Sequence, residues 1–516
     1  MAETFRLTLA QMNPTVGAIL ANADKARAAW AEGKAAGAGM VALTEMFITG
    51  YQTRDLILKP AFVADAMAAI EQLAKDCADG PALGIGGPWW DGEDLFNAYW
   101  VLEGGRVAAR VLKHHLPNDT VFDEVRLFTS ADVAGPYRIG PIRIGTPICE
   151  DAWHEDVTET LAETGAEILL VPNGSPYYRN KYDRRVGLMV ARVIETKLPL
   201  IYLNMVGGQD DQVFDGGSFV LNPGIEIAVQ FPVFDEAFRH VDFVRGEKGW
   251  RAQRTEIVPL PDEWEQDYRA MVMSLGDYVR KSGMKKVLLG LSGGIDSALV
   301  ATIAADALGP ENVRCVMLPS EYTSAHSLDD AKAVAQALGA RLDTIGIEGP
   351  RDAVEAALAP LFAGLQPGIA EENIQSRLRG LLLMALSNKF GEMLLTTGNK
   401  SEMAVGYATL YGDMAGGFSV LRDISKTLVY RLARYRNRLG RVIPERIITR
   451  APSAELRANQ TDQDALPPYD VLDAVLEAYV EQDRSPADIV AMGYLPEHVR
   501  KVVRLIKISE YKRRQA

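Results

Sequence analysis

The chain has 516 residues, 48% of them hydrophobic and 24% charged, which is enough for roughly two to four domains with ordinary cores. A net charge of −13 argues against a general nucleic-acid-binding protein or a protein held to membranes by basic residues. Three cysteines without a C-x-x-C pair and six histidines without zinc-ligand spacing exclude a disulfide scaffold and indicate a reducing, cytoplasmic compartment. The N-terminus does not resemble a signal peptide, and no uncharged apolar run approaches the ~20 residues of a membrane span.

The first half of the chain predicts short strands alternating with helices, followed by hairpins. Glu103-Gly104-Gly105 separates two alternating runs and predicts a tight hairpin turn. A mixed sheet with helices at intervals indicates a layered α/β fold. Strands are expected at 5–12, 41–45, 82–87, 96–113 (the hairpin), 138–150, 168–176, 198–206 and 217–231, and helices at 21–38, 61–76 and 153–163.

Charge and proline interrupt this pattern at 246–265, which predicts a linker between a domain at 1–245 and a second domain at 266–516. In the second half, strands alternate regularly with helices. This rhythm predicts a parallel, doubly wound, Rossmann-like sheet. Strands are expected at 287–292, 313–320, 341–348 and 393–399, and helices at 296–308, 324–339, from 349 to about 364, and 371–390.

The segment GLSGGIDS at 290–297 lies between a buried strand and an Ala-rich helix, where backbone amides and a helix N-terminus can hold an anion. Gly293 and Gly294 allow the backbone to approach a phosphate, and Ser292 and Ser297 add hydroxyl donors. The Asp296 carboxylate suits a phosphate site only if Mg²⁺ lies between them. The lysine of a Walker loop is absent. Taken alone, the segment could also be a plain glycine-rich turn.

This segment resembles the SGGxDS loop of the ATP pyrophosphatases, which cleave ATP between its α- and β-phosphates and adenylate a substrate. Five further blocks, in order, resemble the NAD⁺ synthetases of that class: ENIQSRLRG (372–380), TTGNKSE (396–402), YGDMAGGFSVLRDISKT (411–427), PSAELRANQTDQDALPPYD (452–470) and EYKRRQ (510–515). The resemblance spans roughly 262–516 and implies a homodimer with ATP and Mg²⁺ as co-substrate and cofactor.

The same resemblance implies roles for individual residues. Asp296 and Glu402 would hold Mg²⁺, and Asn373, Glu402 and Lys512 would contact deamido-NAD⁺. Without its place in EYKRRQ, Lys512 would be one of several solvated charges on a basic tail. The implied ATP-binding residues are Gly290, Leu291, Ser292, Gly293, Gly294, Ile295, Asp296, Ser297 and Thr397.

Three residues of the first half suggest nucleophilic catalysis. Cys149 ends an apolar strand before a predicted helix, a position that suits a nucleophile but also a buried core cysteine. Glu150 and Asp151 oppose thiolate formation, so a positively charged partner is needed. Glu45, at a strand end, can accept the thiol proton, and Lys113, at another strand end, can stabilise an oxyanion.

These three blocks, in this order, resemble the Glu-Lys-Cys triad of the nitrilase, or carbon–nitrogen hydrolase, superfamily. The resemblance covers roughly 5–240 and implies a four-layer αββα sandwich. It also implies a supporting role for Glu124 in VFDEVRLF and glutamine contacts from Ser175 and Lys181. Ser175 could equally cap the turn after its strand. Where the family usually has tyrosine at the glutamine site (LPNYGVFDE), this chain has Asp119.

Together, the two resemblances imply an enzyme that releases ammonia from glutamine and uses it, with ATP, to amidate deamido-NAD⁺. The products would be NAD⁺, AMP, pyrophosphate and glutamate. One alternative is another glutamine-dependent amide ligase with the same ATP loop. Another is a nitrilase-type amidase with a nucleotide-binding domain. A non-catalytic scaffold is a third, and three separate catalytic blocks argue against it.

Overall fold

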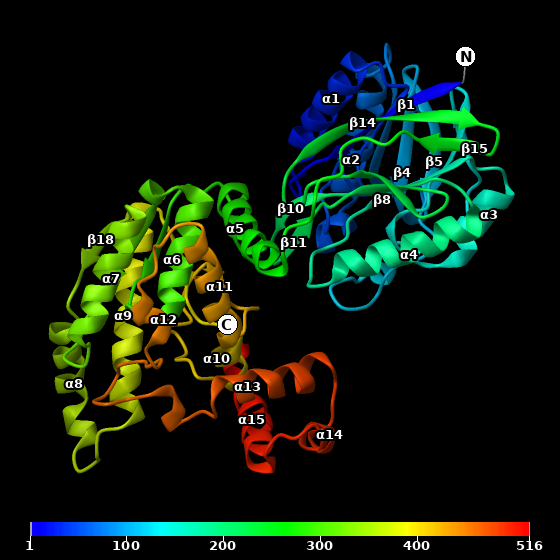
Figure 1. Ribbon diagram of the computed structural model, residues 1–516. Helices are drawn as coiled ribbons and strands as arrows, with labels where there is room; N and C mark the ends of the chain where they lie inside the picture. The colour runs from blue at the N-terminus through cyan, green and yellow to red at the C-terminus, as the bar shows by residue number, and fades with distance from the viewer. Residues whose placement is uncertain (1–2, 515–516) are drawn as a thin grey trace. The chain divides into compact units, whose positions relative to one another are not determined.

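The computed structural model describes residues 3–514, which form two compact units, one ending at Asp277 and the other beginning at Tyr278 (Figure 1). The division falls within helix α5 (Glu263–Lys281), downstream of the expected linker. Part of that expected linker is a strand: Gly249–Ala252 forms β15, which pairs with β14 (Ala237–Gly246) at the sheet edge. It is ordered there because Trp250 buries its ring in the core of the unit.

The first unit has four layers, with two helices on each outer side of two stacked sheets. Among the described residues, one sheet has the strand order β15-β14-β1-β2-β3-β4-β5 and the other β13-β12-β9-β8-β7-β6. Helices α1 and α2 pack on the first sheet and α3 and α4 on the second. This is the αββα sandwich expected from the sequence. The remaining bounds are β1 Thr4–Gln11, β2 Met40–Ala42, β3 Ala82–Trp90, β4 Leu95–Glu103, β5 Arg106–Leu112, β6 Tyr137–Ile139, β7 Ile142–Gly145, β8 Ile168–Asn173, β9 Leu200–Asn204, β10 Val206–Gln209, β11 Gln212–Asp215, β12 Phe219–Asn222, β13 Glu226–Gln230, α1 Ile19–Ala35, α2 Pro60–Asp76, α3 Glu155–Glu163 and α4 Lys181–Thr196.

Strand residues alternate between two cores because successive side chains point to opposite faces of a sheet. In β4, Tyr99 and Val101 pack between the sheets, whereas Ala98, Trp100 and Leu102 pack against α1 and α2. Such strands are apolar on both faces, which explains their continuous hydrophobic runs. The hairpin between β4 and β5 turns at Gly104 and Gly105, both with positive φ, as predicted.

The second unit is built on a parallel sheet with the order β18-β17-β16-β19-β20. The order reverses at β16, so the loops after β16 and β19 diverge to opposite faces and leave a crevice, the usual ligand position in such sheets. Helices α10, α13, α14 and α15 form a separate apolar cluster (yellow to red in Figure 1). The strands and helices of the second unit are β16 Val287–Gly290, β17 Val313–Met317, β18 Arg341–Thr344, β19 Met393–Thr396, β20 Phe418–Ser419, α6 Ile295–Leu308, α7 Ala325–Leu338, α8 Glu348–Phe362, α9 Ile369–Phe390, α10 Lys400–Val405, α11 Lys426–Arg438, α12 Glu445–Thr449, α13 Tyr469–Leu476, α14 Pro486–Ala491, α15 Pro496–Ile508 and α16 Glu510–Arg513.

Within residues 3–514, no helix is both long and apolar enough to cross a bilayer.

Candidate active sites

A buried charge cluster lies at the strand ends of the first unit. Lys113, directly after β5, places its Nζ 2.7 Å from Glu45 Oε1 and 2.7 Å from Glu124 Oε2. Glu45 and Lys113 are 0% exposed. Burial works to lower the pKa of Lys113, but the charges of Glu124 and Glu45 outweigh it and hold that pKa well above its usual value. The lysine is therefore a fixed cation facing two carboxylates.

Three further groups hold these carboxylates in place. Asn97 Nδ2 donates to Glu45 Oε1 at 2.8 Å, and the Gly174 amide donates to Glu45 Oε2 at 2.8 Å. The Tyr51 hydroxyl donates to Glu124 Oε1 at 2.7 Å. Burial, together with the charge of Glu45, raises the pKa of Glu124, while Lys113 opposes that rise. Each oxygen of Glu45 thus has a donor, so its orientation is set before any substrate arrives.

Cys149 lies where the chain leaves β7 and enters a 3-10 helix, Cys149–Trp153. Its φ of 48° is in the left-handed region, unusual for a residue with a side chain. Such a sharp turn is one of the strained conformations that cluster at functional sites. Burial raises the pKa of the thiol well above its ordinary value, and the charge of Glu45 raises it further, while Lys113 works in the opposite direction. The Cys149 side chain is therefore a neutral thiol at rest.

Asp151 connects the segment of the lysine to that of the cysteine. Its Oδ1 accepts hydrogen bonds from the amides of His114 at 3.1 Å and His115 at 2.7 Å, and its Oδ2 accepts one from the Ile148 amide at 2.9 Å. The side chain is buried. One carboxylate thereby joins the residues that follow Lys113 to the residue that precedes Cys149.

Of the expected glutamine-binding residues, Ser175 and Lys181 lie in the buried region and Asp119 does not. Ser175 follows β8, and its Oγ accepts a hydrogen bond from Arg185 Nε at 3.2 Å. Lys181 begins α4 with its Nζ over the rings of Trp153, at 4.7 Å, and Tyr178, at 4.4 Å. Burial lowers the pKa of the Lys181 ammonium group.

Asp119 is exposed in a surface turn, where its carbonyl accepts a hydrogen bond from the Phe122 amide. A pocket of about 360 Å³ opens beside Tyr51 and Glu124, lined partly by neighbouring Val121 and Asp123. Asp119 is not part of that lining. The side chain is therefore placed toward solvent and not with the buried cluster.

In the second unit, the segment 290–297 contains the last residue of β16, the connecting loop and the first residues of α6, as expected for a strand-to-helix turn. Gly293 has a φ of 79°, and a Cβ there would lie 2.2 Å from the Ser327 carbonyl oxygen. The Gly294 amide donates to Ser292 Oγ, and the Ser292 amide to Ser297 Oγ, each at 3.2 Å. Seven of the eight loop residues line a pocket of about 300 Å³, together with Thr397 and Glu402. Gly293 is the exception, and its backbone packs closely against that of Ser327 in α7.

Asp296 and Glu402 meet at the Nζ of Lys426, which lies 2.5 Å from Asp296 Oδ2 and 3.0 Å from Glu402 Oε1. Asn399, after β19, donates to Asp296 Oδ1 at 2.8 Å. Burial raises the pKa of Glu402 to about 7, with Lys426 lowering it and Asp296 raising it. Two carboxylates converging on one buried cation provide the hard oxygen donors that Mg²⁺ prefers, so the residue set fits that ion.

The residues expected to bind the dinucleotide, Asn373, Glu402 and Lys512, do not share a common set of contacts. Asn373 accepts a hydrogen bond from Thr409 Oγ1 at 2.9 Å. Lys512 donates to the carbonyl oxygens of Gly406 at 2.6 Å and Ala408 at 2.7 Å. Lys512 and Glu402 line the same pocket of about 230 Å³, and Asn373 is not in the lining of either pocket of this unit described here.

Several residues in these sites did not stand out in the sequence. Lys426 and Asn399 lie inside blocks that resemble a family, yet no local pattern distinguishes them from other polar residues there. Asp151 lies two residues after the cysteine and stood out only as an opposing charge. The other two are Tyr51, which is followed by polar residues with no recognisable motif, and Asn97, which lies between the apolar residues Phe96 and Ala98.

Comparisons with known proteins agree with this division into two sites. Family models match residues 6–245 as carbon-nitrogen hydrolase and residues 267–516 as NAD synthase. "Glutamine-dependent NAD(+) synthetase" from Rhodobacter capsulatus is 63% identical, covering 100% of this chain and 95% of the relative. The protein of that name from Xanthomonas campestris is 46% identical, covering 100% and 94%.

A solved structure also matches the chain over both units. A glutamine-dependent NAD⁺ synthetase from Acinetobacter baumannii, in complex with ADP, matches with a TM-score of 0.84 at 40% identity, covering 100% of this chain and 95% of that one. Since similarity at these levels extends over both units, the chain belongs to the family of glutamine-dependent NAD⁺ synthetases.

Proposed function

We propose that this enzyme forms NAD⁺ from deamido-NAD⁺, ATP and ammonia released from glutamine. Glutamine and water yield glutamate and ammonia in one unit. Deamido-NAD⁺, ATP and ammonia yield NAD⁺, AMP and pyrophosphate in the other. The observation that carries the proposal is the full-length similarity to glutamine-dependent NAD⁺ synthetases, which includes both units.

In the glutaminase unit, Cys149 is the proposed nucleophile. Glu45 accepts the thiol proton as sulfur attacks the side-chain carbonyl of glutamine, and Lys113 stabilises the oxyanion. The same proton passes from Glu45 to the departing ammonia, which leaves a thioester. Water, deprotonated by Glu45, then releases glutamate and restores the thiol. A raised thiol pKa requires a base at hand, and the fixed orientation of Glu45 supplies one.

Glu124 and the glutamine-binding residues have supporting roles in this scheme. Glu124 shares Lys113 with Glu45 and so keeps the ammonium group directed into the site. Ser175 and Lys181 are proposed to contact glutamine, with the partly desolvated Lys181 suited to its carboxylate. The third expected contact, Asp119, is at most peripheral because its side chain is exposed.

In the synthetase unit, the loop 290–297 and Thr397 are proposed to bind ATP through amides and hydroxyls. The carboxylate of deamido-NAD⁺ attacks the α-phosphorus of ATP, pyrophosphate leaves, and ammonia displaces AMP from the resulting acyl adenylate. Asp296 and Glu402 would hold Mg²⁺, which neutralises phosphate charge when bound. Asn373, Glu402 and Lys512 are proposed to contact deamido-NAD⁺. The side chain of Lys426 keeps the two carboxylates together.

We further propose that the enzyme is a homodimer or a larger homo-oligomer located in the cytoplasm. Family resemblance supports the first, and the three unpaired cysteines fit the second.

The test separates the nitrogen sources. Cys149→Ala should lose glutamine-dependent NAD⁺ formation by orders of magnitude, because no thioester can form. It should retain synthesis from a concentrated ammonium salt at mildly alkaline pH, with AMP as the nucleotide product. Cys77→Ala, which changes another buried cysteine of the same unit, should keep both activities. A folded Cys149→Ala enzyme that is inactive with both sources, or active with both, would contradict the proposal. ADP as product would do so as well.

A further inference from the structure

Three of the six histidines of the chain lie together beside the glutaminase site: His114 and His115 are consecutive, and His154 lies 39 residues farther along the chain. The ring of His115 is 4.6 Å from the ring of His114 and 4.0 Å from that of His154, measured between centroids. Two carboxylates adjoin them: Asp156 bonds to His115, and Glu150 Oε1 lies 3.5 Å from His154 Nε2. The mechanism above uses none of these side chains.

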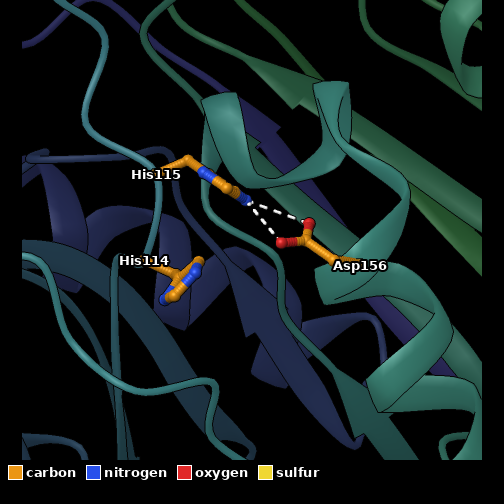
Figure 2. A group of neighbouring side chains, drawn as sticks. All are labelled: His114, His115 and Asp156. Atoms are coloured by element: carbon orange, nitrogen blue, oxygen red, sulfur yellow. Dashed lines mark hydrogen bonds and ion pairs between the residues drawn. The ribbon is translucent and has the colours of Figure 1, made fainter.

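Figure 2 shows three of these residues: His114, His115 and Asp156. Each offers one atom that could ligate a metal, and the three atoms lie within 4.8 Å of one another. His115 Nε2 is 2.9 Å from Asp156 Oδ1 and 3.0 Å from Oδ2. The histidines come from the loop after β5 and the aspartate from the first turn of α3. A loop and a helix that are far apart in the sequence therefore bring the three side chains together.

We propose that His114, His115 and Asp156 bind a divalent transition-metal ion of the zinc class. Two imidazoles and one carboxylate are a common zinc ligand set, with a water in the remaining position. Zinc bonds of ~2.0–2.1 Å place ligand atoms about 3.4 Å apart in a tetrahedral site, so small side-chain rotations suffice. Asp156 is 55% exposed and His115 26%, which gives an ion access from solvent and the side chains room to rotate.

His114 makes a hydrogen bond of the kind that orients metal-binding histidines. Its Nδ1 lies 2.5 Å from the Ala131 carbonyl oxygen, so this nitrogen carries the proton and Nε2 is left as the ligand atom. A backbone carbonyl that orients the imidazole in this way is usual for metal-bound histidines. The competing interpretation is an exposed His115–Asp156 ion pair with two rings packed beside it, and the experiment below distinguishes the two.

The position of the site also predicts what an ion would do. The amides of His114 and His115 are those that Asp151 binds, directly after Lys113. An ion held by the two rings would restrain the same loop. Since it binds the folded state, it should raise the thermal stability of the glutaminase unit in proportion to the logarithm of its concentration over Kd.

The experiment uses the full chain carrying Cys149→Ala, so that the thiol cannot ligate, with excess Mg²⁺ to occupy oxygen-rich sites. Zn²⁺ affinity is measured by competition with a chromophoric chelator, and thermal unfolding is recorded with and without Zn²⁺. We expect one competing site per chain. Adding Asp156→Asn or His115→Ala should weaken it by at least about tenfold and abolish the thermal shift. Glu155→Gln, which removes the neighbouring charge from the same turn of α3, is the matched control and should change neither.

Cobalt gives a second, independent readout. Co²⁺ bound to wild-type protein at this site should show visible absorption without the sulfur-to-cobalt charge-transfer band that Cys149 ligation would produce. The proposal is overturned if Asp156→Asn binds Zn²⁺ as tightly as Glu155→Gln does. It is also overturned if the Cys149→Ala protein does not compete with the chelator, since the cluster would then be only an ion pair with packed rings.

Discussion

Replacing Gly293 by alanine tests whether the shape of the phosphate loop determines ATP use. Gly293 has a φ of 79°, where an alanine costs about 1–2 kcal/mol. The added Cβ would also lie 2.2 Å from the Ser327 carbonyl oxygen, a backbone atom of α7 that cannot turn aside. The loop must therefore move away from α7 by roughly 1 Å, and a displacement of that size at a catalytic centre can lower a rate about 100-fold.

We expect Gly293→Ala to lower kcat/KM for ATP by about 100-fold, equally with glutamine and with ammonia, since both routes use the adenylate. Glutamine hydrolysis without ATP should be unaffected. The assay is NAD⁺ formation under varied ATP with saturating deamido-NAD⁺, and circular dichroism confirms folding.

Gly290→Ala, at the last residue of β16 just before the loop, is the matched control. A Cβ there has its nearest neighbour, Leu383 Cδ1, at 3.4 Å, an ordinary contact, and the φ of Gly290 is not positive. Its kcat/KM for ATP should stay within about threefold of wild type. If Gly293→Ala behaved like Gly290→Ala, the loop would not be held by its contact with α7 and the reasoning would be refuted.

Three other predictions concern single side chains. The Asp151 carboxylate accepts three backbone hydrogen bonds, and in Asp151→Asn the side-chain NH₂ group would face one of these amide donors. Losing that hydrogen bond costs about 1–3 kcal/mol. Glutamine-dependent kcat should fall about 10- to 100-fold, with KM for glutamine and the ammonia-dependent rate unchanged; a change in KM alone would contradict this. Asp119→Asn should alter KM for glutamine less than about twofold, because the carboxylate is exposed, and a larger effect would place it in the site. Burial raises the pKa of Cys315 from 9.0 to about 12, so the folded protein binds this proton more tightly. Its contribution to stability is complete below pH 9 and is lost as pH rises toward 12. Wild type should therefore lose about 1 kcal/mol more than Cys315→Ala between pH 8 and pH 10 in urea unfolding of the synthetase unit, and equal losses would exclude the effect.

The order and type of most elements could be predicted from the sequence because they depend on local patterns. Apolar runs bounded by glycine and charge predicted the strands, and β16, α6, β17 and α7 lie within a few residues of the expected ranges. The loop at 290–297 and the triad candidates Glu45, Lys113 and Cys149 were also visible, because their chemistry lies in short segments at strand ends. The linker was harder to predict, since the charged residues around Trp250 hide an edge strand.

Tertiary structure decided which residues, distant in the sequence, form ion pairs and hydrogen bonds with one another. Lys426 lies between Asp296 and Glu402, 130 and 24 residues away along the chain, because β16 and β19 are neighbours at the reversal of the sheet. Asp151 joins the segment after Lys113 to the segment before Cys149 through backbone amides, which have no signature in a sequence. Strand order and loop direction bring such partners together, and these depend on how whole sheets pack. A sequence can therefore identify residues able to do the chemistry, whereas the fold determines their partners and thus their protonation and orientation.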